Sequence, residues 1–190
     1  MFPLDEDGVL RTERLVLRPA RAGDAEALFR LFTWDVARWL SAPPWPYTMD
    51  NARDWSAQHA AWREDGPRGA LFVTLEGDFI GCVDVVMKTA GATQSGDGPR
   101  MGWWIGEPFW GRGYVTEAAG AMIGRVFAAG DYPEIYCGAY ADNAASLRVQ
   151  EKLGFVRDGE DELFSRPRGV AFAHVETKLT REAWARRAAV

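Results

Sequence analysis

Residues 102–118 read Gly102-Trp-Trp-Ile-Gly-Glu-Pro-Phe-Trp-Gly-Arg-Gly-Tyr-Val-Thr-Glu-Ala118, and this stretch decides the fold. Its beginning predicts a strand over residues 101–105, and its end opens a helical pattern over residues 115–129. Gly111 and Gly113 lie in the turn between them, where the lack of a Cβ lets a ligand approach the backbone. The first N–H groups of a helix have no intrahelical partners, and the helix dipole is positive at that end. The stretch therefore predicts a seat for a pyrophosphate group.

Two glycines before a helix are a weak signal by themselves, because an ordinary tight turn uses them as well. The sequence lacks the motifs of the Rossmann and P-loop nucleotide-binding folds. It has no GxGxxG after its first strand and no GxxxxGK followed by Ser or Thr. The remaining elements must therefore support or reject the phosphate-binding interpretation.

The elements around this stretch alternate irregularly between strands and helices. Upstream we expect a strand at residues 13–18, a helix opening at Asp24, a loop with three prolines at 41–47, a helix at 50–63, and a hairpin of strands at 70–75 and 79–87. After a polar loop at 89–99 and the central stretch come a strand at 134–140, a helix at 143–153 ended by Gly154, and strands at 155–165 and 170–179. This order indicates one α/β or α+β domain over residues 1–190 with a mixed central sheet.

Composition narrows the class of function. The 190 residues carry 22 Lys and Arg against 27 Asp and Glu, and the net charge of −5 argues against a nucleic-acid partner. Cys82 and Cys137 lie in apolar runs and are expected to be buried free thiols, and no His or Cys spacing suggests a metal site. The sequence shows no signal peptide and no apolar run long enough for a bilayer, so we expect a cytoplasmic protein without a membrane partner.

Two segments resemble conserved motifs of one enzyme family. Residues 109–118 resemble motif A of the Gcn5-related N-acetyltransferases (GNAT), and residues 143–155 resemble motif B. The strand Gly-Trp-Trp-Ile-Gly, the turn Trp-Gly-Arg-Gly-Tyr and the two chain ends are similar to the RimJ/RimL branch, which acetylates ribosomal-protein N-termini. The resemblance covers nearly the whole chain and is specific for the superfamily, but much less so for the substrate.

The resemblance implies a mostly antiparallel sheet with a V-shaped opening between the motif A strand and the next strand, where acetyl-CoA binds. Backbone groups of Trp104 and Ile105, and the side chain of Asn143, would hold the pantetheine arm. The pyrophosphate would contact the run Trp110, Gly111, Arg112, Gly113, Tyr114, Val115 and Thr116. An amine would then attack the thioester directly.

The reaction also needs an acid for the leaving thiolate and a base for the amine. Ser146 is the candidate acid for the leaving thiolate, with a helix-start serine as the equal alternative. Many relatives carry a tyrosine where this chain has Gln150, and a glutamate before the motif A strand that this chain lacks. Asp84, a carboxylate in an otherwise apolar strand, is the candidate base, with a polar strand face or catalysis by water as alternatives.

The acceptor is expected to be a primary amine, either a protein N-terminus or a small molecule. Trp39, Trp45 and Tyr47, which lie before or within the proline loop, are expected to shape its pocket, although packing against the core is an equal explanation. An aminoglycoside acetyltransferase and a silent CoA-binding domain are the alternatives. The resemblance is also compatible with a homodimer.

Overall fold

The computed structural model describes residues 8–60, 68–87 and 98–188 of the chain. Eight strands form one sheet in the order β1-β2-β3-β4-β5-β6-β8-β7. All neighbours are antiparallel except β5 and β6, which are parallel, so the predicted mixed sheet is confirmed. The strands are β1 Leu10–Arg11, β2 Leu15–Arg18, β3 Arg68–Leu75, β4 Asp78–Met87, β5 Pro99–Ile105, β6 Glu134–Tyr140, β7 Val156–Ser165 and β8 Val170–Thr180.

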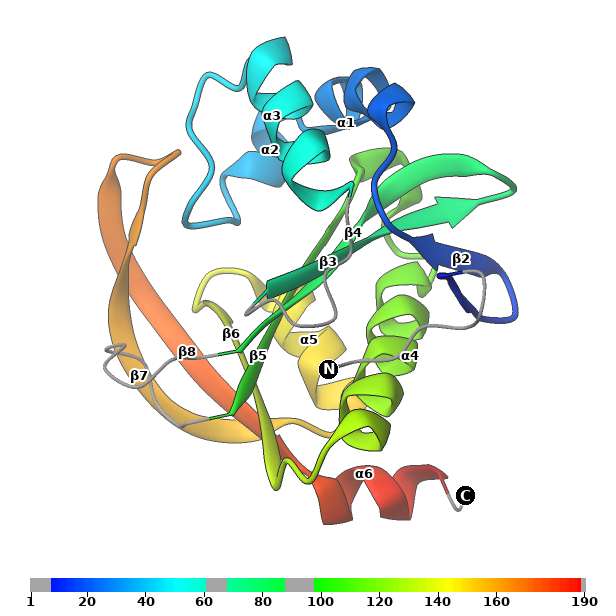
Figure 1. Cartoon of the computed structure of the whole chain (residues 1–190). Coiled ribbons are helices and arrows are strands. Elements are labelled where there is room, and N and C mark those ends of the chain that lie inside the picture. The colour runs from blue at the N-terminus through cyan, green and yellow to red at the C-terminus, as the bar shows by residue number, and fades with distance from the viewer. Residues whose placement is uncertain (1–7, 61–67, 88–97, 189–190) are drawn as a thin grey trace.

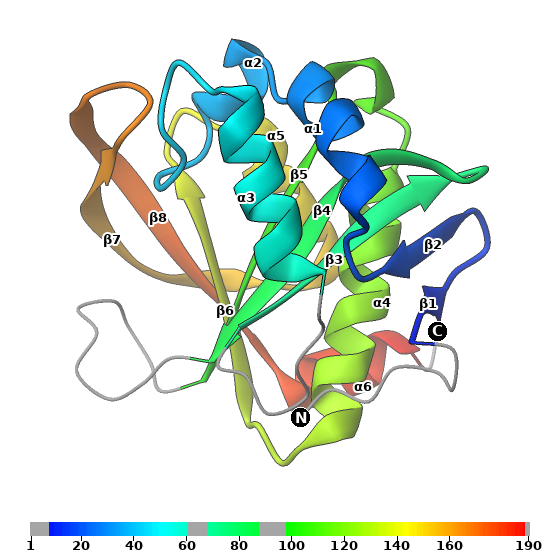
Figure 2. The same cartoon turned by 45° about the horizontal axis from the view of Figure 1, so that its top comes forward.

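Helices cover both faces of the sheet, as Figures 1 and 2 show. We call one side the α1–α3 face and the other the α4–α5 face. The helices are α1 Ala25–Leu31, α2 Trp34–Ala37, α3 Met49–His59, α4 Tyr114–Ala129, α5 Ala144–Leu153 and α6 Arg181–Ala188, with 3₁₀ turns at Ala22–Asp24 and Glu107–Phe109. None of these helices is long and apolar enough to cross a membrane.

Each face has its own hydrophobic core because successive strand side chains point to opposite sides. The larger core joins strand residues such as Leu71, Val83 and Ile135 to α4 and α5. The smaller core joins α1 to α3 with Phe72 and Phe79. Both cysteines are buried free thiols, as expected.

Several elements differ from the prediction. The sequence analysis missed β1 and α2, which are two and four residues long, and α6, whose Trp184 packs beside Gly120 and Gly124 of α4. Asp24 precedes α1 but does not cap it, because its carboxylate accepts two 2.7 Å hydrogen bonds from the buried Arg18 guanidinium.

Other predicted boundaries fall outside the described residues or shift slightly. The helix expected at 50–63 is described as α3, and residues 61–63 lie outside the described ranges, as does most of the loop expected at 89–99. Gly154 ends α5 in the left-handed region with φ +92°, whereas Gly130 ends α4 in extended backbone with φ −167°. These differences leave the strand-turn-helix order around the central stretch unchanged.

Candidate active site

The V-shaped opening expected in the sheet lies between β5 and β6. These parallel strands pair only at Arg100 and Tyr136, although both strands are described throughout. Beyond that pair β5 continues to Ile105 and β6 to Tyr140 without a shared ladder. A cavity of about 1260 Å³ follows the opening and reaches from the α4 N-terminus to the α1–α3 helices. The splayed strands thus give a ligand access to the backbone of both.

The predicted phosphate seat occupies one end of this cavity. Gly111 and Gly113 have φ of +74° and +80°, a region that only glycine adopts without strain. The helix begins at Tyr114, and its first intrahelical bond runs from the N–H of Glu117 to the carbonyl of Gly113. The N–H groups of residues 114–116 therefore have no intrahelical acceptor, and these residues line the cavity. The geometry suits an anion at a helix N-terminus.

Of the seven residues in the predicted pyrophosphate run, the structure places six along the cavity. Arg112 is the exception, because its backbone carbonyl accepts a 3.1 Å hydrogen bond from Nη1 of Arg14 instead. The Trp110 indole N–H donates to the carbonyl of Ile105 at 2.6 Å, so that carbonyl is already engaged within the protein. The Trp104 ring packs edge-on against Phe32 at 5.2 Å, and the Trp104 carbonyl is turned toward Gly81 of β4.

Arg14 and Glu117 hold the glycine turn in place, and the sequence analysis missed this contact. Arg14 Nε and Nη2 lie 2.7 Å from Glu117 Oε2, and the guanidinium also stacks over the Tyr114 ring at 4.6 Å. Thr12 adds a 2.6 Å hydrogen bond to the other carboxylate oxygen. Burial pushes the pKa of Glu117 up, but the bonds from Thr12 and Arg14 outweigh it and leave the pKa below its usual value. The turn between β1 and β2 thus braces the first turn of α4.

Replacing Arg14 with methionine should weaken acetyl-CoA binding about 3- to 10-fold, because the turn loses two charge-assisted hydrogen bonds but keeps its glycines. The measurement is the dissociation constant from calorimetry. Arg157→Met removes an exposed ion pair on β7 and serves as the matched control. Equal affinities for the wild type and both variants would show that the brace has no bearing on the seat.

The start of α5 supplies the next group of polar side chains. Asn143 caps the helix, because its Oδ1 accepts from the N–H of Ser146 at 3.1 Å, and both residues line the cavity. The buried Gln150 donates to Ser146 Oγ at 3.3 Å and accepts from Thr177 Oγ1 at 2.7 Å. Gln150 therefore supports Ser146 and leaves the serine proton available for another acceptor, a role that the sequence analysis did not assign.

Two tyrosines of β6, Tyr136 and Tyr140, are the other hydroxyl groups to consider as acids. The Tyr136 hydroxyl donates to Glu134 at 2.5 Å, and this bond, together with burial, raises its pKa to about 12. Tyr140 lines the cavity, and burial raises the pKa of its phenol as well. Neither environment favours proton donation near neutral pH.

The opposite side of the cavity lies under α1, α2 and α3. Asp84 is half-buried on β4 and leans over Gly102 of β5, where a Cβ would come within 2.5 Å of its Oδ1. Trp39 and Tyr47 line this side, and Tyr47 packs against Phe32 at 4.3 Å. Trp45 does not line the cavity; it packs against Trp34 at 5.3 Å on the surface. The proline loop thus brings two of its three predicted rings to the cavity.

Comparison with known proteins agrees with this geometry. The protein YdaF of Bacillus subtilis (strain 168), whose name describes a ribosomal N-acetyltransferase, is 25% identical over 156 residues, which cover 78% of this chain and 81% of YdaF. Mycobacterium smegmatis RimJ, solved with CoA-disulfide, has a TM-score of 0.75 at 23% identity, covering 96% of this chain and 92% of that chain.

The microcin C7 self-immunity acetyltransferase MccE, solved with acetyl-CoA and AMP, has a TM-score of 0.75 at 18% identity, covering 89% of this chain and 93% of that chain. The family model described as an acetyltransferase (GNAT) domain matches residues 14–156. Because that match spans well over half of the 190 residues, the chain belongs to the GNAT family of acetyltransferases.

Proposed function

We propose that this enzyme moves the acetyl group of acetyl-CoA to a primary amine by direct attack of the amine on the thioester. The observation that carries the proposal is the opening between β5 and β6, with the unpaired first turn of α4 at its end. An anion seat and an adjacent strand edge in one cavity match the two chemical parts of coenzyme A, its pyrophosphate and its amide-bearing arm. Two structural neighbours, RimJ and MccE, were solved with forms of this ligand.

The described residues favour particular contacts for each part of that ligand. The N–H groups from Gly111 to Thr116 would hold the pyrophosphate, and backbone groups of β5 beside the opening would pair with the arm. Asn143 has its Oδ1 committed to the helix cap, so its amide NH₂ is the group left to donate to the arm. Burial raises the pKa of Cys137 to about 12, so this cavity-lining thiol is a poor nucleophile, which favours direct attack over an acyl-cysteine.

Ser146 is the proposed proton donor to the departing thiolate. Ser146→Ala should lower kcat roughly 10- to 100-fold while the KM for acetyl-CoA stays nearly unchanged, because the hydroxyl acts only after binding. Ser146→Thr, which keeps a hydroxyl at the same position, is the matched control and should retain most of the activity. If alanine and threonine behave alike, the serine serves only the start of α5.

The acceptor side of the cavity favours a cationic amine. Asp84 and Asp54 are among the residues that line it, and Trp39 and Tyr47 offer apolar walls. We propose that Asp84 receives the ammonium group. A protein N-terminus is the first acceptor to test, because YdaF is named as a ribosomal N-acetyltransferase.

The experiment begins with calorimetry of acetyl-CoA, with NADPH and ATP as control ligands. Thiol release is then followed with acetyl-CoA and three kinds of amine: peptides that begin with Ser or Ala, spermidine, and the aminoglycoside kanamycin. Binding of acetyl-CoA alone, with thiol release for at least one amine, supports the proposal. Binding without any release would favour a silent CoA-binding domain, and release with kanamycin alone would favour antibiotic modification.

A further inference from the structure

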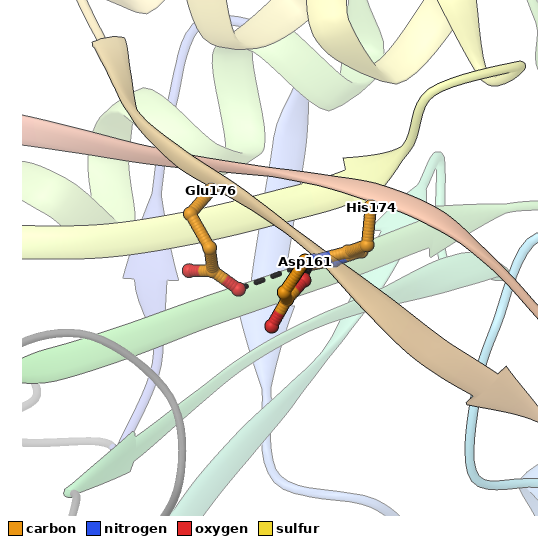
Figure 3. Close-up of side chains that lie close together, drawn as sticks. All are labelled: Asp161, His174 and Glu176. Carbon is orange, nitrogen blue, oxygen red and sulfur yellow. Dashed lines mark hydrogen bonds and ion pairs between the residues drawn. The ribbon is translucent and has the colours of Figure 1, made fainter.

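His174 on β8 lines the cavity. Two carboxylates, Asp161 and Glu176, lie close to its ring (Figure 3). The Nδ1 of His174 donates to Asp161 Oδ1 on β7 at 3.1 Å and lies 3.2 Å from Oε1 of Glu176, two residues further along β8. The other oxygen of Glu176 accepts a 2.5 Å hydrogen bond from Arg100, which reaches across from β5. His174 and Glu176 are both buried. Four charged or titratable side chains thus form one connected group, which we call the His174 cluster.

These contacts fix which ring nitrogen of His174 carries the hydrogen. Two carboxylates at Nδ1 favour an N–H there, so in the neutral ring the lone pair lies on Nε2. The Nε2 edge lies over Gly138 of β6, where a Cβ would come within 2.8 Å of Nε2 and closer still to Cε1. Among the described residues the recorded hydrogen bonds and ion pairs of the ring are all on Nδ1. A lone pair held this way is suited to accepting a proton.

The position of the ring relates it directly to the opening. Arg100 pairs with Tyr136 in the parallel register, so Gly102 and Gly138, two residues further on, stand at the same level where the strands separate. Asp84 leans over Gly102 from one side, and His174 leans over Gly138 from the other. The absence of a Cβ at both glycines lets the side chains of Asp84 and His174 lie close to the strand backbones at the opening.

The carboxylate of Glu176 beside the His174 ring is kept ionised by the groups around it. Burial alone would raise the pKa of Glu176, but the contacts with His174 and Arg100 outweigh burial and hold this pKa below its usual value. Glu176 therefore remains ionised and stabilises a positive imidazole. The other groups around the ring are Asp161 on β7, the Tyr140 ring edge-on at 5.8 Å on β6, and Asp84 across the opening on β4. Histidine and carboxylates can also bind a metal ion, but Arg100 already supplies a cation to Glu176.

We propose that His174 is the general base of the reaction, with Asp161 and Glu176 as positioning residues and Asp84 as the carboxylate that binds the ammonium group. This inference rests on the proposed function. Nε2 takes a proton from R–NH₃⁺, and the nitrogen lone pair of R–NH₂ then attacks the thioester carbon. The C–S bond breaks with its electron pair on sulfur, and a second amine proton reaches the thiolate by way of Ser146. His174 releases its proton to water, so each acetyl transfer frees one proton.

Kinetics of His174→Gln test the base. With acetyl-CoA and the peptides, spermidine or kanamycin as acceptors, kcat should fall about 100- to 1000-fold, because glutamine cannot take a proton. The KM for acetyl-CoA should change little, and the acid limb of the pH profile that the imidazole imposes should disappear. Added imidazole should restore part of the activity of His174→Ala. Lys178→Gln, on the same face of β8 but away from the cavity, is the matched control.

Nitrogen NMR tests the ring geometry without any acceptor. The chain has two histidines, so the His59→Gln variant assigns their signals. The neutral His174 ring should carry its hydrogen on Nδ1, and its Nε2 should show the signal of a nitrogen with a free lone pair.

The outcomes separate the inference from the proposed function. A neutral ring protonated on Nε2, or His174→Gln with wild-type kcat, would overturn the role of His174 while leaving the acetyltransferase intact. Loss of activity without rescue by imidazole, together with weaker acetyl-CoA binding and a lower melting temperature, would assign His174 to folding instead. A wild-type protein that releases thiol with none of the amines would defeat both the proposed function and the inference.

Discussion

Replacing Gly113 with glutamate should abolish measurable binding of acetyl-CoA, a loss of about 100-fold or more in affinity. Gly113 has φ +80° and directly precedes the first residue of α4. Any other residue there carries a left-handed strain of roughly 1–2 kcal/mol, and the carboxylate adds a negative charge where the pyrophosphate is proposed to lie. The new side chain can also pair with Arg14, whose Nη2 lies 3.5 Å from the position of the added Cβ. The measurement is calorimetry with acetyl-CoA.

Two further variants separate the causes of that loss. Gly113→Ala introduces the backbone strain without the charge and should lose less affinity than the glutamate variant. Gly77→Glu places the same side chain at φ +94° in the turn between β3 and β4, where nothing lies within 4 Å, and should bind as the wild type does. Wild-type affinity in Gly113→Glu would remove the glycine turn from the binding site.

Asp84→Asn should raise the KM for a cationic acceptor about 10- to 100-fold, because a charge-assisted hydrogen bond to the ammonium group becomes a neutral one. Acetyl-CoA binding should persist, because Asp84 leans over Gly102 on the α1–α3 face rather than toward the α4 N-terminus. Steady-state kinetics over a range of pH, with each acceptor varied, provide the measurement.

The same kinetics distinguish Asp84 from the His174 cluster. A group that binds the ammonium affects mainly KM, whereas a group that takes the proton affects mainly kcat and the acid limb. Asp78→Asn, at the first residue of β4 and outside the cavity lining, is the matched carboxylate control. An unchanged acceptor KM in Asp84→Asn would place the acceptor elsewhere in the cavity.

The central strand-turn-helix could be predicted because its information is local. Left-handed glycines, the unpaired first turn of a helix and a preceding strand all follow from consecutive residues 101–118. The same local reasoning found α5 and its end at Gly154. It also found the hairpin of β3 and β4, whose turn residues carry positive φ at Glu76 and Gly77.

The remaining parts of the site depend on contacts between distant segments. Arg14 meets Glu117 only because β2 lies near the first turn of α4, and 103 residues separate them. The role of His174 could not be predicted, because it depends on strand register: Asp161 is opposite it on β7, and Gly138 leaves room beside it on β6. The two-residue β1 and the short helix α2 gave no periodic pattern long enough to detect.

The single pairing between β5 and β6 also has a mechanical meaning. It divides the sheet into a five-stranded half, β1 to β5, and a three-stranded half, β6, β8 and β7, which share one ladder position and the adjacent ion pair of Arg100 with Glu176. Because the ladder is so short there, the core on the α4–α5 face, which contains residues of both halves, holds them together. A ligand bonded to both strand edges would add a second connection, so occupancy of the opening can be followed as a rise in the melting temperature.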